Sequence, residues 1–207
     1  MSVDIAELPT VGRMTGPEFR AFQDTRPDHE RWELIAGVPV MMVPPTIAHN
    51  RLSYNFTRLL NDALEQYDTS RIAIAQSGLE LEAGNYKPEP DVYVIDADFV
   101  AGQRFADGAY LLAEVVSSTD DVRVPGTRRP WIEVKREIYL AQDKCEAVVI
   151  IQQDRIEVLV DVRTATGWQS DVLEGEETEL ALPSFGLRCR VKALYAGTPL
   201  IRRRAVP

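Results

Sequence analysis

The stretch Leu-Leu-Ala-Glu-Val-Val-Ser at residues 111–117 is a short apolar run that holds a single acid, Glu114. Its length and composition predict a β-strand. A carboxylate inside a protein costs free energy unless it is paired with a cation or bound to a metal. Glu114 is therefore a candidate functional residue. The pattern alone leaves two alternatives open: a solvent-facing position on an edge strand, or one partner of an ordinary salt bridge.

Further strands and helices are predicted on both sides of this run. Apolar runs bounded by turn residues predict strands at 71–76, 78–82, 91–95, 147–152 and 156–162, and a hairpin from 32–35 and 38–43. Capping residues and helical spacing predict helices at 15–26, 46–67 and 131–142. The order predicts an α+β or α/β fold, in which a mixed β-sheet is flanked by helices. An N-terminal helix and hairpin and a C-terminal β arm complete it.

The length of 207 residues and a hydrophobic content of 45% predict one soluble domain. We divide it into a core at 15–160 and a β arm at 161–200. No apolar run approaches the roughly 18 residues of a membrane span, and the N-terminus lacks the pattern of a signal peptide. Cys145 and Cys189 have no neighbours at metal-ligand spacing, which indicates reduced thiols in a cytoplasmic protein.

The net charge restricts the classes of nucleic-acid protein that this chain could be. It has 23 basic and 32 acidic residues, for a formal charge of -9. This balance argues against a protein that coats nucleic acid, because neutralising phosphates requires a surplus of Lys and Arg. It still permits an enzyme with a local basic track. Arg128, Arg129 and Arg136 fall in one stretch after Glu114 and are the candidates for such a track, where they would contact nucleic acid.

Asp91 is the second candidate acid, because it follows two prolines at the mouth of the strand 91–95. Acids brought together from two strands repel each other, and a divalent cation relieves the repulsion. Carboxylate oxygens suit Mg²⁺ or Mn²⁺. For Asp91 alone, capping a turn is a commoner role than catalysis. Glu33 repeats the pattern in the strand 32–35, where a solvent-facing position in the hairpin is the alternative.

Three further residues are possible members of the same site. Lys135 and Tyr139 are four residues apart, so they share one face of the helix that follows Glu114. The alternative is an ordinary amphipathic helix with a solvated lysine and a packed tyrosine. His49 lies in the first turn of the helix 46–67, where a capping or packing role is the alternative.

Taken together, these segments resemble the Uma-type restriction endonuclease family, part of the PD-(D/E)XK nuclease superfamily. The similarity covers about residues 15 to 160. The hairpin sequence at 32–37, Trp-Glu-Leu-Ile-Ala-Gly, is similar to the family's Tyr-Glu-Leu-Ile-Asp-Gly. Five other segments match in order: Met-Val-Pro-Pro at 42–45 with His49, Pro-Asp-Val at 90–92, Ala-Glu-Val-Val-Ser at 113–117, Lys-Arg-Glu-Ile-Tyr at 135–139, and Glu146 before an apolar strand.

The resemblance implies a site and a fold. The Pro-Asp and Glu strands would lie side by side in a mixed sheet, with Asp91 and Glu114 as metal ligands and Glu33 as a further one. Val116 stands where the superfamily usually has lysine, so Lys135 on the helix becomes the catalytic lysine. It would orient the attacking water and stabilise charge in the transition state. The chain departs from the family at Trp131, where an Asp is usual, and Asp120 or Asp121 are the candidates to compensate.

Three functions are consistent with this interpretation. The first is an endonuclease that uses Mg²⁺ or Mn²⁺ to hydrolyse DNA phosphodiester bonds, with Asp91, Glu114 and Lys135 as catalytic residues and Glu33, His49 and Tyr139 as possible additions. We expect a homodimer, because cutting both strands needs two sites or two visits, although a nickase needs neither. The second is a degenerate nuclease fold that binds DNA or protein without catalysis. The third is a homo-oligomer joined through the apolar segment 185–194.

Overall fold

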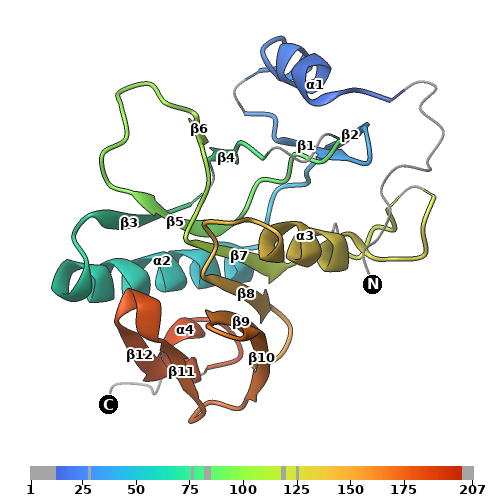
Figure 1. Ribbon diagram of the computed structural model, residues 1–207. Helices are drawn as coiled ribbons and strands as arrows, with labels where there is room; N and C mark the ends of the chain where they lie inside the picture. The colour runs from blue at the N-terminus through green and yellow to red at the C-terminus, as the bar shows by residue number, and fades with distance from the viewer. Residues whose placement is uncertain are drawn as a thin grey trace.

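The computed structural model describes residues 13–27, 29–75, 77–81, 85–117, 120–124 and 126–201. Its centre is a six-stranded sheet in the order β10-β9-β8-β7-β5-β3 (Figure 1). The strands are β3 (Arg71–Ile74), β5 (Val92–Asp96), β7 (Leu111–Val116), β8 (Ala147–Gln152), β9 (Glu157–Thr164) and β10 (Gly167–Glu174). The pair β7–β8 is parallel and the other neighbours are antiparallel, which confirms the predicted mixed sheet.

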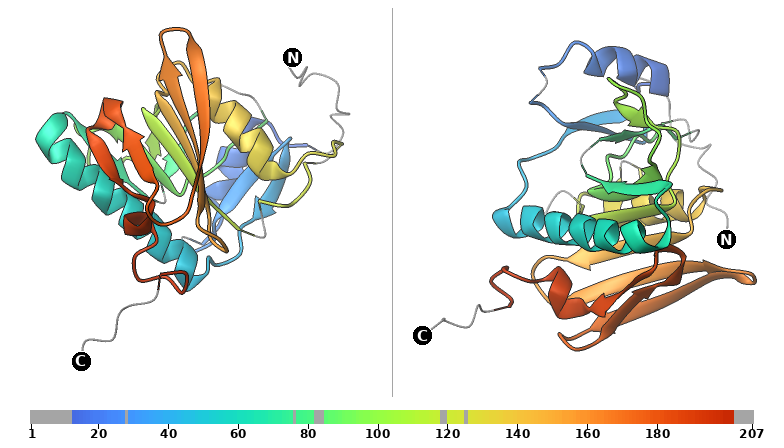
Figure 2. Two further views of the ribbon diagram at one scale, coloured as in Figure 1. Left: turned by 90° about the horizontal axis from the view of Figure 1, so that it is seen from below. Right: turned by 90° about the vertical axis from the view of Figure 1, so that its left-hand side faces the viewer.

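Two helices cover opposite faces of this sheet, as the left view of Figure 2 shows. Helix α2 (Ile47–Tyr67) packs on the face that carries Leu111, Ala113 and Val115 of β7. Helix α3 (Trp131–Leu140) packs on the face that carries Leu112 and, next along, Glu114. The alternation of side chains along a strand explains this division. Parallel strands need a crossover connection, and α3 is the crossover from β7 to β8.

The N-terminal segment forms a small layer beside the sheet (Figure 1). Helix α1 (Gly16–Gln23) begins with the predicted capping box, in which Thr15 and Glu18 bond each other's backbone N–H groups. A two-stranded sheet follows, made of β1 (Trp32–Ile35) and β2 (Val38–Met41). Its tight turn requires positive φ at both central residues, Ala36 at 50° and Gly37 at 81°. Such turns match the twist of the flanking strands, so the hairpin fixes where β1 presents its acid.

The remaining elements lie at the edges of the molecule. Strands β4 (Gly78–Leu79) and β6 (Phe105–Ala106) form a short parallel pair, and β11 (Glu179–Leu182) pairs with β12 (Leu187–Arg190). The one-turn helices η2 (Pro183–Phe185) and α4 (Val191–Leu194) flank β12. The ends of the predicted strands at residues 76 and 82 lie outside the described residues.

The C-terminal apolar segment corrects one sequence-based hypothesis. Phe185, Leu187, Val191 and Leu194 are buried in the same core as helix α2. These apolar side chains stabilise the chain's own interior, and so they do not form an exposed surface that could join subunits. Before this segment, β9 and β10 extend the central sheet.

Candidate active site

Glu114 is buried in the middle of the sheet, with 1% of its surface exposed. Strand β7 lies between β5 and β8, so the alternative of an edge position is wrong. Because α3 crosses this face, two side chains of the helix reach the carboxylate. The Tyr139 hydroxyl donates to Oε1, and Lys135 Nζ donates to Oε2 at 3.1 Å. The four-residue spacing of Lys135 and Tyr139 therefore directs both of them to one acid.

Lys135 is also buried, and its ammonium lies among three carboxylates. Nζ is 3.0 Å from Glu33 Oε1, 3.1 Å from Glu114 Oε2 and 3.2 Å from Asp120 Oδ1. Burial alone would lower the pKa of this lysine, but the surrounding carboxylates outweigh it and hold the pKa well above its usual value. The ammonium is therefore charged at neutral pH and serves as the buried counterion of the site.

Asp91 lies at the mouth of β5, beside the strand that carries Glu114. Its Oδ1 is 2.9 Å from His49 Nε2, and its Oδ2 accepts from the backbone N–H of Val115 at 2.9 Å. Burial acts to raise the pKa of Asp91. The hydrogen bond and charge of His49, with Lys135 and the Val115 N–H, reverse this effect and leave the pKa below its usual value. Thr46, the N-cap of α2, positions His49 by accepting from its backbone N–H at 3.1 Å.

The site holds more buried negative charge than its lysine can neutralise. Glu33, Asp91, Glu114 and Asp120 are all at most 7% exposed. Burial raises the pKa of Glu114 well above its usual value; Lys135 opposes the rise, while Asp91 and the other acids add to it. A group of oxygen ligands with a charge surplus of this kind favours the binding of a further cation.

Glu33 has a different environment from Asp91 and Glu114. It is fully buried rather than solvent-facing. It does not line the cleft of about 770 Å³ that opens over the other acids. Its Oε1 accepts from the backbone N–H of Glu89 at 2.9 Å, in addition to its contact with Lys135. Its Oε2 accepts from Trp131 Nε1 at 2.7 Å. Glu33 thus connects the hairpin, the segment before β5 and helix α3.

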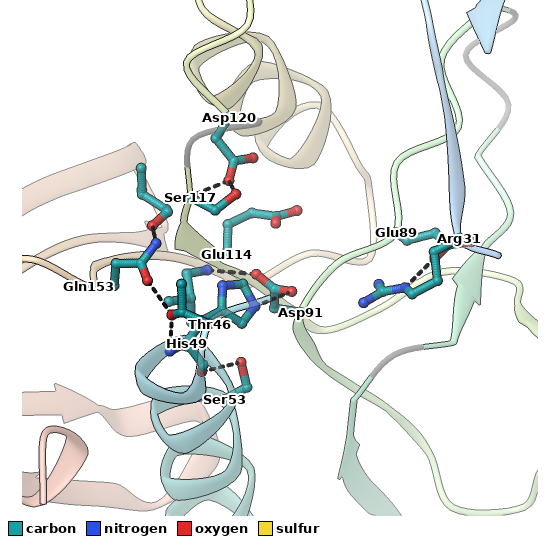
Figure 3. Close-up of polar contacts among 12 residues, drawn as sticks. Arg31, Thr46, His49, Ser53, Glu89, Asp91, Glu114, Ser117, Asp120 and Gln153 are labelled. Carbon is teal, nitrogen blue, oxygen red and sulfur yellow. Dashed lines mark hydrogen bonds and ion pairs between the residues drawn. The ribbon is translucent and has the colours of Figure 1, made fainter. Parts of the chain in front are cut away.

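A cleft of about 770 Å³ opens over the acids. Asp91, Glu114, Asp120, Lys135 and His49 line it, whereas Tyr139 lies behind Glu114 and does not. Figure 3 shows Asp91, Glu114 and Asp120 around one space, with His49 beneath them. Asp120 comes from the loop between β7 and α3, where its Oδ2 accepts from the backbone N–H and the hydroxyl of Ser117, both at 2.8 Å.

The three arginines predicted to contact DNA do not line this cleft. Arg129 forms an ion pair with Glu137, with Nη2 2.6 Å from Oε1, and Arg136 pairs with the buried Asp161. Arg128 is exposed. The structure therefore brings Asp91, Glu114, Lys135 and His49 together at the cleft and leaves Arg128, Arg129 and Arg136 outside it.

The residues present fit a magnesium-type cation chemically. Among the described residues, no three His, Cys, Asp or Glu side chains form a ready-made metal site. Mg²⁺ does not require one, because it keeps several water ligands and is commonly bound through one or two carboxylates. Asp91 and Glu114 provide two such carboxylates from adjacent strands, both lining the cleft.

Comparison with known proteins agrees with this architecture. The model of the Uma2 family, described as "Putative restriction endonuclease", matches residues 17–192. The chain belongs to the Uma2 family. The match confirms the resemblance drawn from the sequence and includes every candidate residue discussed above. Such membership supports a nuclease function.

A solved structure supports the Uma2 fold independently. It is the crystal structure of a "putative nuclease belonging to DUF820" from Anabaena variabilis ATCC 29413. The two chains share 15% identity with a TM-score of 0.63, over 84% of this chain and 95% of that chain. At this identity the similarity shows a common restriction-endonuclease-like fold.

No curated protein matches the chain by sequence. No helix among the described residues is long and apolar enough to cross a membrane.

Sequence reasoning missed several cleft residues of the Uma2 chain, among them Arg31, Gln153 and Arg155, and only suggested Asp120. Arg31 lines the cleft, with its guanidinium directed toward Asp91 in Figure 3. Strand alternation could have identified it, because residues 31 and 33 share a face, as do 89 and 91. Asp120 was named only as one of two acids that could compensate for Trp131. No local pattern separates it from its neighbour Asp121.

Proposed function

We propose that this chain is an endonuclease that uses Mg²⁺ or Mn²⁺ to hydrolyse phosphodiester bonds of DNA. The observation that carries the proposal is the convergence of Asp91, Glu114 and Lys135 at one cleft, with Lys135 Nζ 3.1 Å from Glu114. Membership of the Uma2 family and the fold of the putative nuclease support the same reaction class.

In this proposal Asp91 and Glu114 would hold the cation. When bound, the cation would polarise the phosphate and make a water molecule more acidic. The chain's own residues supply the rest of the chemistry. Lys135 is a preorganised positive charge at the cleft, placed to stabilise the additional negative charge on the phosphate in the transition state.

The other predicted residues are assigned to positioning. Tyr139 donates to one oxygen of Glu114, and the second oxygen accepts from Lys135. His49 and the Val115 N–H fix the rotation of the Asp91 carboxylate. Glu33 holds Lys135 from behind the cleft, so we assign it to positioning rather than to metal binding.

The second candidate function is a degenerate nuclease fold that binds DNA or a protein without cutting. One observation favours it: Lys135 is already within 3.2 Å of three carboxylates, so its ammonium has no free direction toward a substrate. The two candidates differ in whether a cation displaces some of these contacts.

Further parts of the proposal concern assembly and location. Cutting both strands of a duplex needs two clefts or two visits by one cleft, and we propose a homodimer as the form that makes double-strand breaks in one encounter. The two free cysteines agree with a cytoplasmic location.

The test is cleavage of plasmid, single-stranded and branched DNA with Mg²⁺ or Mn²⁺, by the natural chain and by Glu114→Gln. Glu146→Gln is the matched control, because this partly exposed acid lies just before β8 and pairs with Arg71 outside the cleft. We expect metal-dependent cleavage that falls at least about a hundredfold in Glu114→Gln and persists in Glu146→Gln. Equal cleavage by Glu114→Gln and the natural chain would reject the assignment.

A further inference from the structure

A second cleft of about 460 Å³ adjoins the candidate active site. The two clefts share two lining residues, Arg31 and Glu89. Glu89 accepts from Arg31 Nε at 3.0 Å, so the ion pair forms the border between the clefts. Glu89 is fixed in turn, because its backbone N–H donates to the buried Glu33. Arg31 is thus linked through Glu89 to Glu33, the carboxylate that contacts Lys135.

Charge favours a path for a polyanion from the first cleft into the second. The first cleft is lined by six acids and only three residues of Lys or Arg. The second is lined by three acids and three arginines, so a phosphate chain meets less repulsion there. Its acids are partly engaged, since Glu30 accepts from Trp32 Nε1 at 2.9 Å and Glu89 from Arg31.

Arg31 has free donors at this border. Of the cleft's basic side chains, Lys135 is surrounded by three carboxylates, and Arg155 pairs with Asp154 and Glu157. Arg31 bonds Glu89 through Nε alone, and within the described ranges its terminal nitrogens Nη1 and Nη2 have no hydrogen-bond partner. These two nitrogens match the bidentate binding of a phosphate.

The lining of the second cleft also suits nucleobases. Trp32 and Phe105, both partly exposed, line this cleft together with the exposed Arg104. The guanidinium of Arg20 covers one face of the Phe105 ring, 3.8 Å from its centroid. Aromatic rings next to a cationic track are the combination that binds single-stranded nucleic acid, because each base has a face that can stack.

We propose that Arg31 binds a backbone phosphate of a single-stranded segment of nucleic acid that passes from the active-site cleft into the second cleft. Trp32, Phe105 and Arg104 would receive the nucleotides beyond that phosphate. The inference rests on the proposed function for the identity of the ligand. In this proposal the substrate passes Arg31 at the border of the two clefts, and not the arginines near α3 that were predicted from the sequence.

The test measures binding of fluorescent oligonucleotides to the full chain by fluorescence anisotropy. Ca²⁺ replaces Mg²⁺ to limit hydrolysis. The probes are a dinucleotide, a single strand of about ten nucleotides and the matching duplex. The variants are Arg31→Ala and Arg104→Ala. Arg155→Ala is a control for a paired arginine of the first cleft, and Arg128→Ala for an exposed arginine outside both clefts. Thermal unfolding of each variant checks that it is folded.

We expect Arg31→Ala to weaken binding of both single-stranded probes by about ten- to a hundredfold. Arg104→Ala should weaken binding of the longer strand and leave the dinucleotide unaffected, and neither control should change affinity appreciably. Equal affinity of the natural chain and folded Arg31→Ala would overturn the inference, as would tighter binding of the duplex than of the single strand.

Cleavage measured in parallel separates this inference from the proposed function. Cleavage by the natural chain together with Arg31-independent binding rejects the inference alone. Arg31-dependent binding without any cleavage rejects the enzyme alone and supports the track. Absence of both binding and cleavage rejects the two proposals together.

Discussion

Lys135 Nζ lies 3.2 Å from Asp120 Oδ1, and both side chains are almost completely buried. This contact joins helix α3 to the loop that precedes it, and it places a fourth acid beside the site formed by Glu33, Asp91 and Glu114. The same loop acid accepts from Ser117, which directly follows β7. The position of the Lys135 ammonium is therefore fixed by the strand that carries Glu114 as well as by the lysine's own helix.

Replacing Lys135 by Met should destabilise the fold strongly, because it leaves three buried carboxylates without their counterion. Breaking a buried ion pair on one side costs about 3–5 kcal/mol, measurable as the free energy of unfolding in urea. Lys192→Met is the control, since that exposed lysine pairs with Glu177 on the surface. We further expect Mg²⁺ to restore part of the lost stability. An unchanged free energy of unfolding in Lys135→Met would contradict the role of Lys135 as counterion.

Replacing Asp120 by Asn should lower the rate of cleavage and leave substrate affinity nearly unchanged. The amide keeps the shape of the side chain but removes one of the charges that hold Lys135, so we expect about a tenfold drop in kcat. Asp121→Asn is the matched control, because this neighbour lines the same cleft but is exposed. If both variants fall equally, the contact between Asp120 and Lys135 has no specific role.

Cys145 should be unreactive toward thiol reagents in the folded protein. It is fully buried, and burial raises the pKa of its thiol to about 12 from an ordinary 9.0. Because the pKa of this thiol is higher in the folded than in the unfolded chain, the buried protonated thiol contributes to the free energy of unfolding. That contribution is complete below pH about 9 and is lost as the pH rises toward 12. At pH 8 we expect labelling of Cys189 only, with the second thiol appearing on unfolding. Labelling of Cys145 in the folded chain at that pH would argue against its burial.

The sequence predicted the fold well because most of its elements are encoded locally. Thr15 with Glu18, and Thr46 before α2, mark the helix starts where the structure has them. Apolar runs identified the strands β5, β7 and β8. The spacing of Lys135 and Tyr139 predicted that they share one face of the helix, and in the structure both contact Glu114. Two-residue strands such as β6 are too short to leave a periodic pattern.

Contacts between distant segments could not be predicted in the same way. Trp131 occupies the position where the family usually has an acid, and only the structure shows that its indole donates to Glu33, 98 residues away. The ion pair of Arg136 also depends on the fold, which brings Asp161 of β9 next to α3. Arg129 pairs locally with Glu137 of α3. Charge counted along the chain therefore overestimated the basic track near α3 and missed Arg31.

Binding of a cation by Asp91 and Glu114 is tested most directly by calorimetric titration of Mn²⁺ into the natural chain, Asp91→Asn and Glu114→Gln, with Glu146→Gln as control. We expect one Mn²⁺ binding site in the natural chain and in the control, and loss of that site in both cleft variants. No binding to the natural chain at millimolar Mn²⁺, or equal binding by the cleft variants, would contradict the claim that Asp91 and Glu114 hold the catalytic cation.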